Sequence, residues 1–302
     1  GTYLACMVVQ DGLRGALLEV GELARFAGRF FSNAMHRRFE WRELMRQCIL
    51  NGNRSLPLVG ITAFIMGMVL TVQSRPTLAR FGAESMLPAM VAISVVREIA
   101  PVITALICAG KIGSSMGAEL GSMKVTEQID AMEVSGTNPF RYLAVTRIWS
   151  TTLTLPILVV MADGIAIWAS WVGVNIKDTV TWDLFYRQVF ESLEFSDVLP
   201  AFIKSYFFGF IVGLVGCYKG FTTAKGTEGV GQSAHSAVVL ASLLIFILDL
   251  VAVQITDHQA IGSLGDFYET ALTPGGLVAG MNGPAQGVEQ PCGIRHGKRC
   301  QR

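Results

Sequence analysis

Charged residues are scarce in this sequence. Only 16% of its 302 residues are Asp, Glu, Lys or Arg, whereas 51% are hydrophobic. Because soluble domains carry about 25% charged residues, this chain has too few charges to keep the surface of a soluble protein hydrated. Its formal net charge of +1 gives no reason to expect a nucleic-acid partner.

The sequence also lacks the motifs that bind nucleotides or catalytic zinc. The glycine-rich stretch Gly226–Gly231 has neither the lysine nor the following hydroxyl residue of a phosphate-binding loop. No H-E-x-x-H motif occurs, and the four histidines are dispersed: His36, His235, His258 and His296. We therefore expect no catalytic residues, no metal site and no cofactor in this chain.

The six cysteines form no C-x-x-C pair. They are scattered over the chain, at Cys6, Cys48, Cys108, Cys217, Cys292 and Cys300. This spacing indicates small apolar packing residues rather than a metal or disulfide framework. A pairing of Cys292 with Cys300 stays open, because it depends on the compartment of the tail.

Long apolar runs divide the chain. Ser55–Ser74 contains no charge over 20 residues, about the length that crosses a hydrocarbon core of about 30 Å. Four further runs follow, at Met86–Gly110, Ile148–Ile176, Val198–Tyr218 and Ala237–Ile255. The sequence therefore predicts an all-α integral membrane protein with about five transmembrane helices, whose membrane domain covers residues 55–255.

The regions outside these runs are different in character. Residues 1–54 are rich in arginine, and Leu23, Phe26, Phe30 and Phe31 recur at helical spacing. This pattern predicts an amphipathic helix on the membrane surface, with a helix packed on a partner protein as the alternative. We expect no cleavable signal peptide. Residues 177–197 predict a short amphipathic helix, Lys219–His235 a glycine-rich loop, and residues 256–302 a polar, poorly ordered tail.

Lysine and arginine in the flanking segments predict the orientation. The N-terminal region, residues 111–147 and Lys219–His235 are basic and fall on one side, whereas residues 177–197 are acidic and fall on the other. The N-terminus is then cytoplasmic. Arg75 and Arg80 do not fit this topology, because it places them outside.

Several charged residues fall inside the predicted spans, where each costs about 2.5–3.5 kcal/mol at a helix centre. Lys204 and Asp249 each lie six residues from the outer end of their helices, about 9 Å deep, so they could pair across neighbouring helices. Arg97 and Glu98 are near mid-depth and diverge by about 100°, so each needs its own partner.

These buried charges permit more than one interpretation. A polar cavity for an amphiphile with a charged head group and a proton relay would both contain such residues. For Lys204, an extended side chain that reaches the interface stays open. For Asp163, the alternative is that it marks a helix end.

A short helix is predicted at Met123–Val134. Val125, Ile129 and Met132 form its apolar stripe, and Ser135-Gly136 followed by Asn138-Pro139 ends it. Such a helix is suited to docking in a groove of a partner protein, although a helix resting on the membrane would show the same periodicity.

Specific motifs surround this helix. They are REIAPV from Arg97, AGKIGS from Ala109, AELGSMKVTEQIDAMEV from Ala118, NPFRYL from Asn138 and CYKGFTTAKGTEGVG from Cys217. Together they resemble the MlaE (YrbE) permease family of MCE-type lipid-transport ABC systems. The resemblance extends from the N-terminal amphipathic helix to about Ile255, whereas family chains usually stop soon after the last span.

The resemblance implies a homodimeric permease with an N-terminal interfacial helix, about five spans and a cytoplasmic coupling helix over Glu119–Glu133. It implies residues that bind the substrate lipid, here Leu70, Leu78, Arg97, Glu98, Lys204 and Asp249. It implies residues that couple to the ATPase, here Glu119, Met123, Lys124, Glu127, Gln128, Asp130 and Glu133.

The resemblance also implies a setting and partners. The chain would be a multi-pass protein of the bacterial inner membrane that moves phospholipid to or from a periplasmic MCE-domain protein. ATP would be hydrolysed on a separate ABC ATPase subunit, which would carry a STAS-domain protein.

Two other classes remain as alternatives. A proton-coupled secondary transporter of an amphiphilic substrate would explain the buried charges, but we find no internal repeat. A membrane-embedded enzyme acting on lipids would need a constellation of catalytic groups that the dispersed histidines do not suggest.

Overall fold

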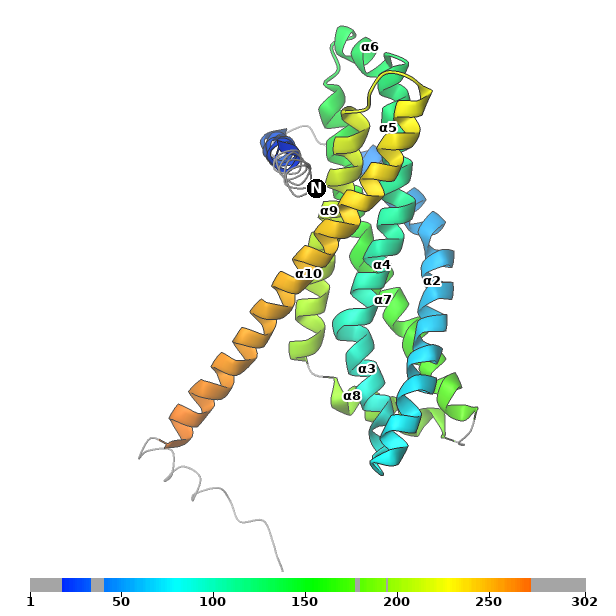
Figure 1. Cartoon of the computed structure of the whole chain (residues 1–302), viewed down its shortest axis with the longest axis vertical. Coiled ribbons are helices and arrows are strands. Elements are labelled where there is room, and N and C mark those ends of the chain that lie inside the picture. The colour runs from blue at the N-terminus through cyan, green and yellow to red at the C-terminus, as the bar shows by residue number, and fades with distance from the viewer. Residues whose placement is uncertain (1–17, 34–40, 177–179, 194, 273–302) are drawn as a thin grey trace, which may run out of the picture. The chain divides into compact units, whose positions relative to one another are not determined.

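The structure is a computed structural model that describes residues 18–33, 41–176, 180–193 and 195–272 (Figure 1). Over these residues the chain is helical apart from short turns, and it contains no strand. This confirms the all-α prediction. The described residues up to Ala252 form one compact unit, and those from Val253 onward belong to a second.

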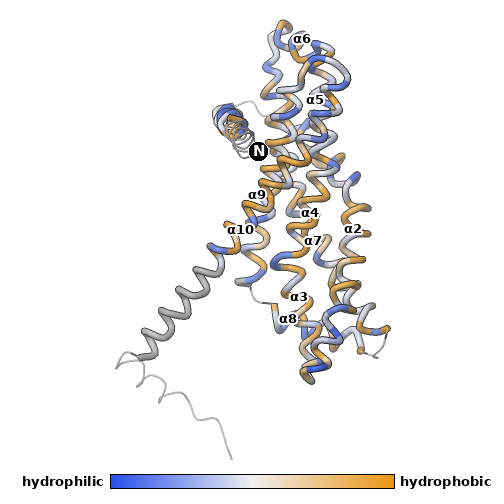
Figure 2. The backbone as a smooth tube through the Cα atoms, viewed as in Figure 1, coloured by the Kyte–Doolittle hydropathy of each residue, from blue (hydrophilic) through white to orange (hydrophobic). Residues whose placement is uncertain are grey.

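Five helical stretches in the described part of the chain are long and apolar enough to cross a membrane, as predicted. They are Trp41–Arg80, Glu84–Val125, Phe140–Asn175, Asp197–Phe221 and Thr227–Thr256. Figure 2 shows hydrophobic residues along the middle of α2, α4, α7 and α9, and more hydrophilic residues around α6. This distribution matches helices whose middles lie in hydrocarbon and whose ends meet water.

The first span is α2 (Trp41–Arg80), which begins well before the apolar run at Ser55. The second stretch is almost continuous and consists of η1 (Glu84–Met86), α3 (Leu87–Ser94), η2 (Val95–Ile99), α4 (Ala100–Cys108), η3 (Ala109–Gly113) and α5 (Ser114–Val125). Its segments η2 and η3 are π-helical turns. Such wide turns often occur at functional sites, because they change which side chains face a neighbour.

The third span joins η4 (Phe140–Val145) to α7 (Thr146–Asn175). The amphipathic helix predicted within residues 177–197 is confirmed as α8 (Trp182–Ser192). It lies at the end of the bundle opposite α6 (Figure 1). The helices α9 (Phe195–Phe221) and α10 (Thr227–Leu272) complete the described chain.

Two predicted irregular segments are largely helical. The predicted loop Lys219–His235 is reduced to residues 222–226, because α9 continues to Phe221 and α10 starts at Thr227. Gly226 permits this tight turn through its φ of 106°. The predicted poorly ordered tail begins at Thr256, yet α10 continues to Leu272, since no proline interrupts it before that point. Residues 273–302, including Cys292 and Cys300, lie outside the described residues, as does Cys6.

The predicted coupling helix is broken. Helix α5 ends at Val125 and α6 (Gln128–Val134) starts after a turn at Thr126 and Glu127. Glu127 has a φ of 58°, a left-handed conformation that no continuous helix contains. The prediction of one helix over Met123–Val134, or over Glu119–Glu133, was therefore wrong. The cause is a backbone kink that side-chain periodicity does not reveal.

Helix 18–33 packs on the bundle. Its residues Leu23, Phe26 and Phe30 are buried in the main hydrophobic core. The Phe26 ring lies 5.0 Å from that of Phe140 and 5.8 Å from that of Tyr218, measured between centroids. The apolar face was predicted to lie on the membrane or on a partner, but most of it contacts the chain itself; Phe31 is exposed.

Glycines allow close contact between α7 and α9. A Cβ atom on Gly209 would lie 2.7 Å from the carbonyl oxygen of Thr151, and one on Gly213 would lie 2.2 Å from the Thr151 hydroxyl. Any larger side chain would separate the two helices. Gly209 and Gly213, four residues apart on α9, thus form a small-x-x-x-small contact surface.

Candidate functional site

Lys204 joins three membrane-spanning segments. Its Nζ lies 2.9 Å from Oε2 of Glu98 on η2 and 2.6 Å from Oδ1 of Asp249 on α10. The Lys204 side chain is only 6% exposed. The predicted pairing of Lys204 with Asp249 is confirmed, and the alternative in which Lys204 extends to the interface is not, because two carboxylates hold its ammonium group inside the bundle.

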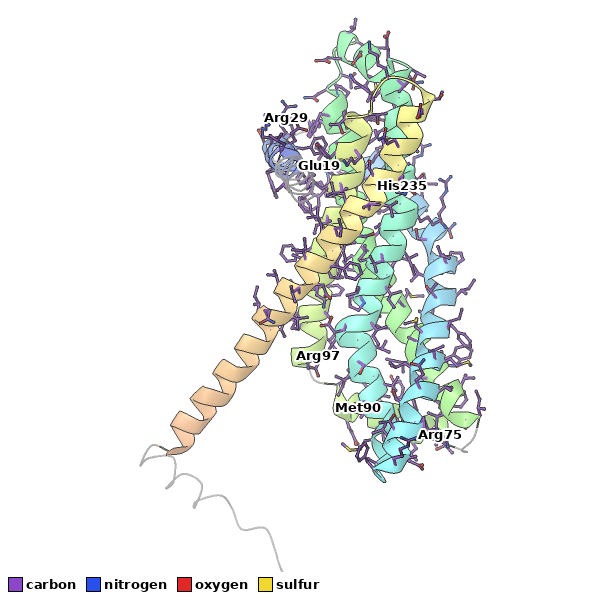
Figure 3. The ribbon with its side chains drawn as sticks, in the orientation of Figure 1. Glu19, Arg29, Arg75, Met90, Arg97 and His235 are labelled. Carbon is purple, nitrogen blue, oxygen red and sulfur yellow. The ribbon has the colours of Figure 1, made fainter. Side chains whose placement is uncertain are left out.

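Arg97 has a separate partner, as predicted from its divergence from Glu98. Its Nε lies 3.6 Å from Oδ1 of Asp197 in the first turn of α9. Figure 3 shows Arg97 near the lower end of α9, at the level where that helix begins. Sequence analysis missed Asp197, because the acidic stretch 177–197 was assigned to a segment outside the membrane.

Five charged residues on η2, α9 and α10 form two ion-pair groups that meet at the adjacent residues Arg97 and Glu98, and we call them together the buried charge cluster: Arg97, Glu98, Asp197, Lys204 and Asp249. Three of them are acidic and two are basic. Arg97 and Glu98 have side chains that are 40% and 45% exposed, whereas Lys204 is shielded. The cluster therefore combines an enclosed ammonium group with two accessible side chains that an outside ligand can reach.

Leu70 and Leu78 lie elsewhere within the chain. Both are on α2 and pack against a second hydrophobic cluster that contains Leu87 of α3 and Phe185 of α8. In Figure 1, α3 and α4 separate α2 from α9. One chain alone does not bring the two leucines to the buried charge cluster, so their shared role in binding stays a prediction.

Asp163 lies inside α7 and does not mark a helix end. Its Oδ1 is buried and has no hydrogen-bond partner among the described residues. The alternative interpretation was wrong, because α7 continues through Asp163 to Asn175.

The predicted coupling residues occupy the opposite end of the bundle. Glu119 on α5 accepts two hydrogen bonds from Arg147 on α7, at 2.8 and 3.1 Å. The Arg147 side chain is 5% exposed and that of Glu119 is 60% exposed. This two-pronged contact fixes the position of α5 relative to α7, because both guanidinium nitrogens must stay aligned with the carboxylate.

Helix α6 turns its apolar side inward. Ile129 is buried, and Met123 and Met132 pack against the main hydrophobic core. Lys124 bridges the kink through an ion pair with Asp130 at 3.0 Å. The remaining predicted coupling residues are exposed: Glu127, Gln128 and Glu133. A partner at this end would therefore meet an acidic and polar face rather than the apolar stripe.

In the described part of the chain, no group of three or more His, Cys, Asp or Glu residues could hold a metal ion. Cys48, Cys108 and Cys217 are free.

Comparison with known proteins assigns this chain to a family. The family described as Permease MlaE matches residues 44–255. A probable ABC transporter permease protein of Rickettsia typhi is 39% identical over 204 residues, which cover 68% of this chain and 79% of the relative. A probable ABC transporter permease protein of Synechocystis is 36% identical over 245 residues, which cover 78% and 91%.

A plant protein is also similar. The Arabidopsis thaliana protein TRIGALACTOSYLDIACYLGLYCEROL 1, chloroplastic, is 33% identical over 225 residues, which cover 74% of this chain and 64% of the relative. The family match spans all five apolar stretches at least in part, and it includes both the buried charge cluster and the α5–α6 region. The chain therefore belongs to the MlaE permease family, as a membrane-spanning permease subunit of an ABC transporter.

Proposed function

We propose that this permease moves phospholipid between the bacterial inner membrane and a periplasmic MCE-domain partner, driven by ATP hydrolysis on a separate subunit. The observation that carries the proposal is the buried charge cluster, in which Lys204 is shared by Glu98 and Asp249. A phospholipid carries a phosphate between apolar tails and a polar head group. A cluster of both signs within otherwise apolar helices offers both environments.

The lipid head group would bind on the side of the cluster where Arg97 and Glu98 are exposed. Arg97 is 40% exposed and is 3.6 Å from Asp197, a separation longer than a close ion pair. A lipid phosphate could therefore take the place of the Asp197 carboxylate on the guanidinium, which binds phosphate in a forked geometry. Lys204 would remain held by its two carboxylates and would keep Glu98 in place.

The relatives support a lipid cargo in a limited way. The plant relative has a galactose-containing glycerolipid in its name, and this chain shares its sequence over 225 residues. Carried to this chain, the likeness favours a glycerolipid over a small soluble substrate. A proton-coupled carrier receives no such support, because the relatives are named as ABC transporter permeases.

The ATPase subunit would bind at the α5–α6 end. The exposed face of Glu127, Gln128, Asp130 and Glu133 presents mostly negative charge, so the facing ATPase surface should be basic. Glu119 would pass displacement of α5 to α7 through its contact with Arg147. A STAS-domain protein would bind the ATPase and not this chain.

Membership of the MlaE permease family also suggests a second copy of the chain and an orientation in the membrane. A second copy of the chain would complete the lipid pocket and bring Leu70 and Leu78 towards the charges. The end of the bundle with α6 and the N-terminal helix, whose membrane-flanking segments are rich in Lys and Arg, would be cytoplasmic.

The first experiment is affinity purification of the tagged full chain in mild detergent, followed by mass spectrometry of proteins and lipids. We expect an ABC ATPase, an MCE-domain protein and bound phospholipid. Recovery of the ATPase without any lipid, in a complex that still hydrolyses ATP, would contradict the lipid cargo.

A pair of substitutions then tests the two ends separately. Arg97→Gln should lower lipid recovery and leave ATPase recovery unchanged. Asp130→Asn should lower ATPase recovery and leave lipid recovery unchanged. It should also uncouple ATP hydrolysis from lipid movement. Identical effects of both substitutions on lipid recovery would argue against two separate functional ends.

A further inference from the structure

A polar cavity lies at the α5 end of the bundle, away from the buried charge cluster. It has a volume of about 440 Å³ and lies between α2, the η3–α5 segment and the η4–α7 segment. Its walls include Arg46, Arg54, Ser115, Glu119, Tyr142 and Arg147. A space of this size accepts a phosphate with the groups attached to it.

The charges around this cavity are unequally compensated. Arg147 is paired with Glu119, and Arg46 lies 3.6 Å from Glu43. Arg54 has no carboxylate partner among the residues that the structure describes. Next to it, Lys111 donates a hydrogen bond to the backbone carbonyl of Arg54 and also has no described carboxylate partner. Within the described part of the chain, one cation without a carboxylate partner, Arg54, therefore lines the cavity, and a second, Lys111, lies beside it.

Three of these cations mark the same boundary on three different spans. Arg54 immediately precedes the apolar run Ser55–Ser74, Lys111 immediately follows Met86–Gly110, and Arg147 immediately precedes Ile148–Ile176. The fold brings the three boundaries together, as the Lys111–Arg54 contact and the lining of the cavity show. They therefore lie where apolar helix gives way to polar surroundings, which is the depth of lipid head groups.

We propose that this cavity binds the phosphate of an anionic phospholipid from the adjoining leaflet, held by Arg54 and Arg46 with Lys111 nearby. This site is separate from the proposed cargo site at Arg97 and Lys204. It is open to a lipid because Arg54 is exposed at the end of an apolar run along which acyl chains can lie. With the orientation proposed above, the leaflet is the cytoplasmic one.

The site would have a regulatory consequence. Glu119 and Arg147 both line the cavity and also join α5 to α7. A phosphate in the cavity would attract Arg147 and compete with Glu119 for it. Occupancy would therefore change how firmly α5 is held, and with it the response of the transporter to the ATPase.

The test uses the full chain in nanodiscs of phosphatidylcholine that contain a photoactivatable phosphatidylglycerol, with labelled peptides mapped by mass spectrometry. We expect labelling of the peptides that contain residues 41–54 and 112–123. Arg54→Gln should lower this labelling about fivefold, and Arg46→Gln in addition about fivefold again, since each basic residue near a membrane surface adds about 1 kcal/mol of attraction to anionic lipid.

Arg42→Gln is the matched control, because it removes the same charge from the same exposed helix outside the cavity lining. Equal loss with Arg42→Gln would overturn the proposal and indicate general surface attraction. Suppression of labelling by inorganic phosphate but not by an excess of unlabelled phosphatidylglycerol would overturn the lipid source in favour of a free phosphate. Unchanged labelling in Arg54→Gln together with loss of a co-purifying ATPase would overturn the lipid site and assign the cavity to protein docking.

Labelling at peptides around Arg97 and Lys204 serves as an internal reference. It should be unchanged by Arg54→Gln, because that site lies in a different part of the bundle. Failure of the proposed cargo site would remove the reference signal alone, so the two proposals fail separately.

Discussion

Lys204 and Arg147 are both buried cations, but they hold carboxylates in different ways. Lys204 is a compact ammonium group that contacts two carboxylates from two other segments, Glu98 and Asp249. Arg147 is a planar group that makes two parallel hydrogen bonds to the single carboxylate of Glu119. A point charge can be shared and its partners exchanged, whereas a forked contact fixes one orientation.

The two kinds of contact suit the two proposed functions, which are lipid binding and coupling to the ATPase. At the buried charge cluster, a shared ammonium group keeps three segments together while Arg97 remains accessible. At the α5 end, a rigid contact is suited to the transfer of motion between helices. Exposure supports the contrast, because Glu119 is largely open to solvent while Asp249 is largely enclosed.

The largest effect is expected from Lys204→Met. This substitution leaves Glu98 and Asp249 facing each other inside the bundle without a cation, which should lower the free energy of unfolding by about 3–5 kcal/mol. Denaturant titration in mixed micelles measures the change. The double substitution Lys204→Met with Asp249→Asn should recover part of the loss. A single variant as stable as the wild type would show that the ion pairs are not buried.

Gly213→Ala tests the contact between the helices that carry the two cations, since Arg147 is on α7 and Lys204 is on α9. The new Cβ would lie 2.2 Å from the Thr151 hydroxyl and 2.9 Å from the Ile148 Cα. We expect a loss of about 1–3 kcal/mol in unfolding free energy. Gly110→Ala is the control, because nothing lies within 4 Å of its Cβ position. Equal stability of both variants would contradict the close α7–α9 packing.

Arg147→Lys sharpens the comparison directly, because it replaces the fork with a point charge. We expect a stability loss of about 1–1.5 kcal/mol, smaller than that of Lys204→Met because water can solvate the exposed Glu119. The ratio of lipid moved to ATP hydrolysed in proteoliposomes should fall at the same time. An unchanged ratio would mean that Glu119 and Arg147 do not transmit motion.

Glu127→Gly should have the smallest effect on stability. Glycine adopts the φ of 58° at this position without the steric cost of about 1–2 kcal/mol that a side chain meets there. Because glycine also costs about 0.5–1 kcal/mol of conformational entropy, we expect a net gain of about 0.5–1 kcal/mol. If the Glu127 carboxylate binds the ATPase, coupling should nevertheless weaken. Glu127→Gln, which keeps the side chain and removes the charge, separates the two contributions. A clear loss of stability in Glu127→Gly would contradict the left-handed conformation.

Much of the fold could be predicted from the sequence. The five apolar stretches and the amphipathic helix α8 follow from local composition and periodicity. The pairing of Lys204 with Asp249 followed from their equal depth along two helices. Span length and the matching depth of Lys204 and Asp249 depend only on the distance along each helix, which the sequence states directly, whereas the contact itself also requires α9 and α10 to lie side by side.

Other features needed the tertiary structure. The ion pairs of Arg97 with Asp197 and of Glu119 with Arg147 depend on which helices lie side by side, and hydropathy does not encode that arrangement. The kink at Glu127 depends on a single backbone angle. The inward face of α6 depends on the core against which Ile129 packs.

The sequence by itself therefore determined that this chain crosses a membrane and how deep its charges lie, because span length and depth are properties of a single helix. Only the tertiary structure decided which charges meet and which are left without a partner, because lateral helix packing depends on side-chain shape and on glycines such as Gly213. The position of Arg54 at the cavity of the α5 end, without a carboxylate partner among the residues that the structure describes, is a product of that packing.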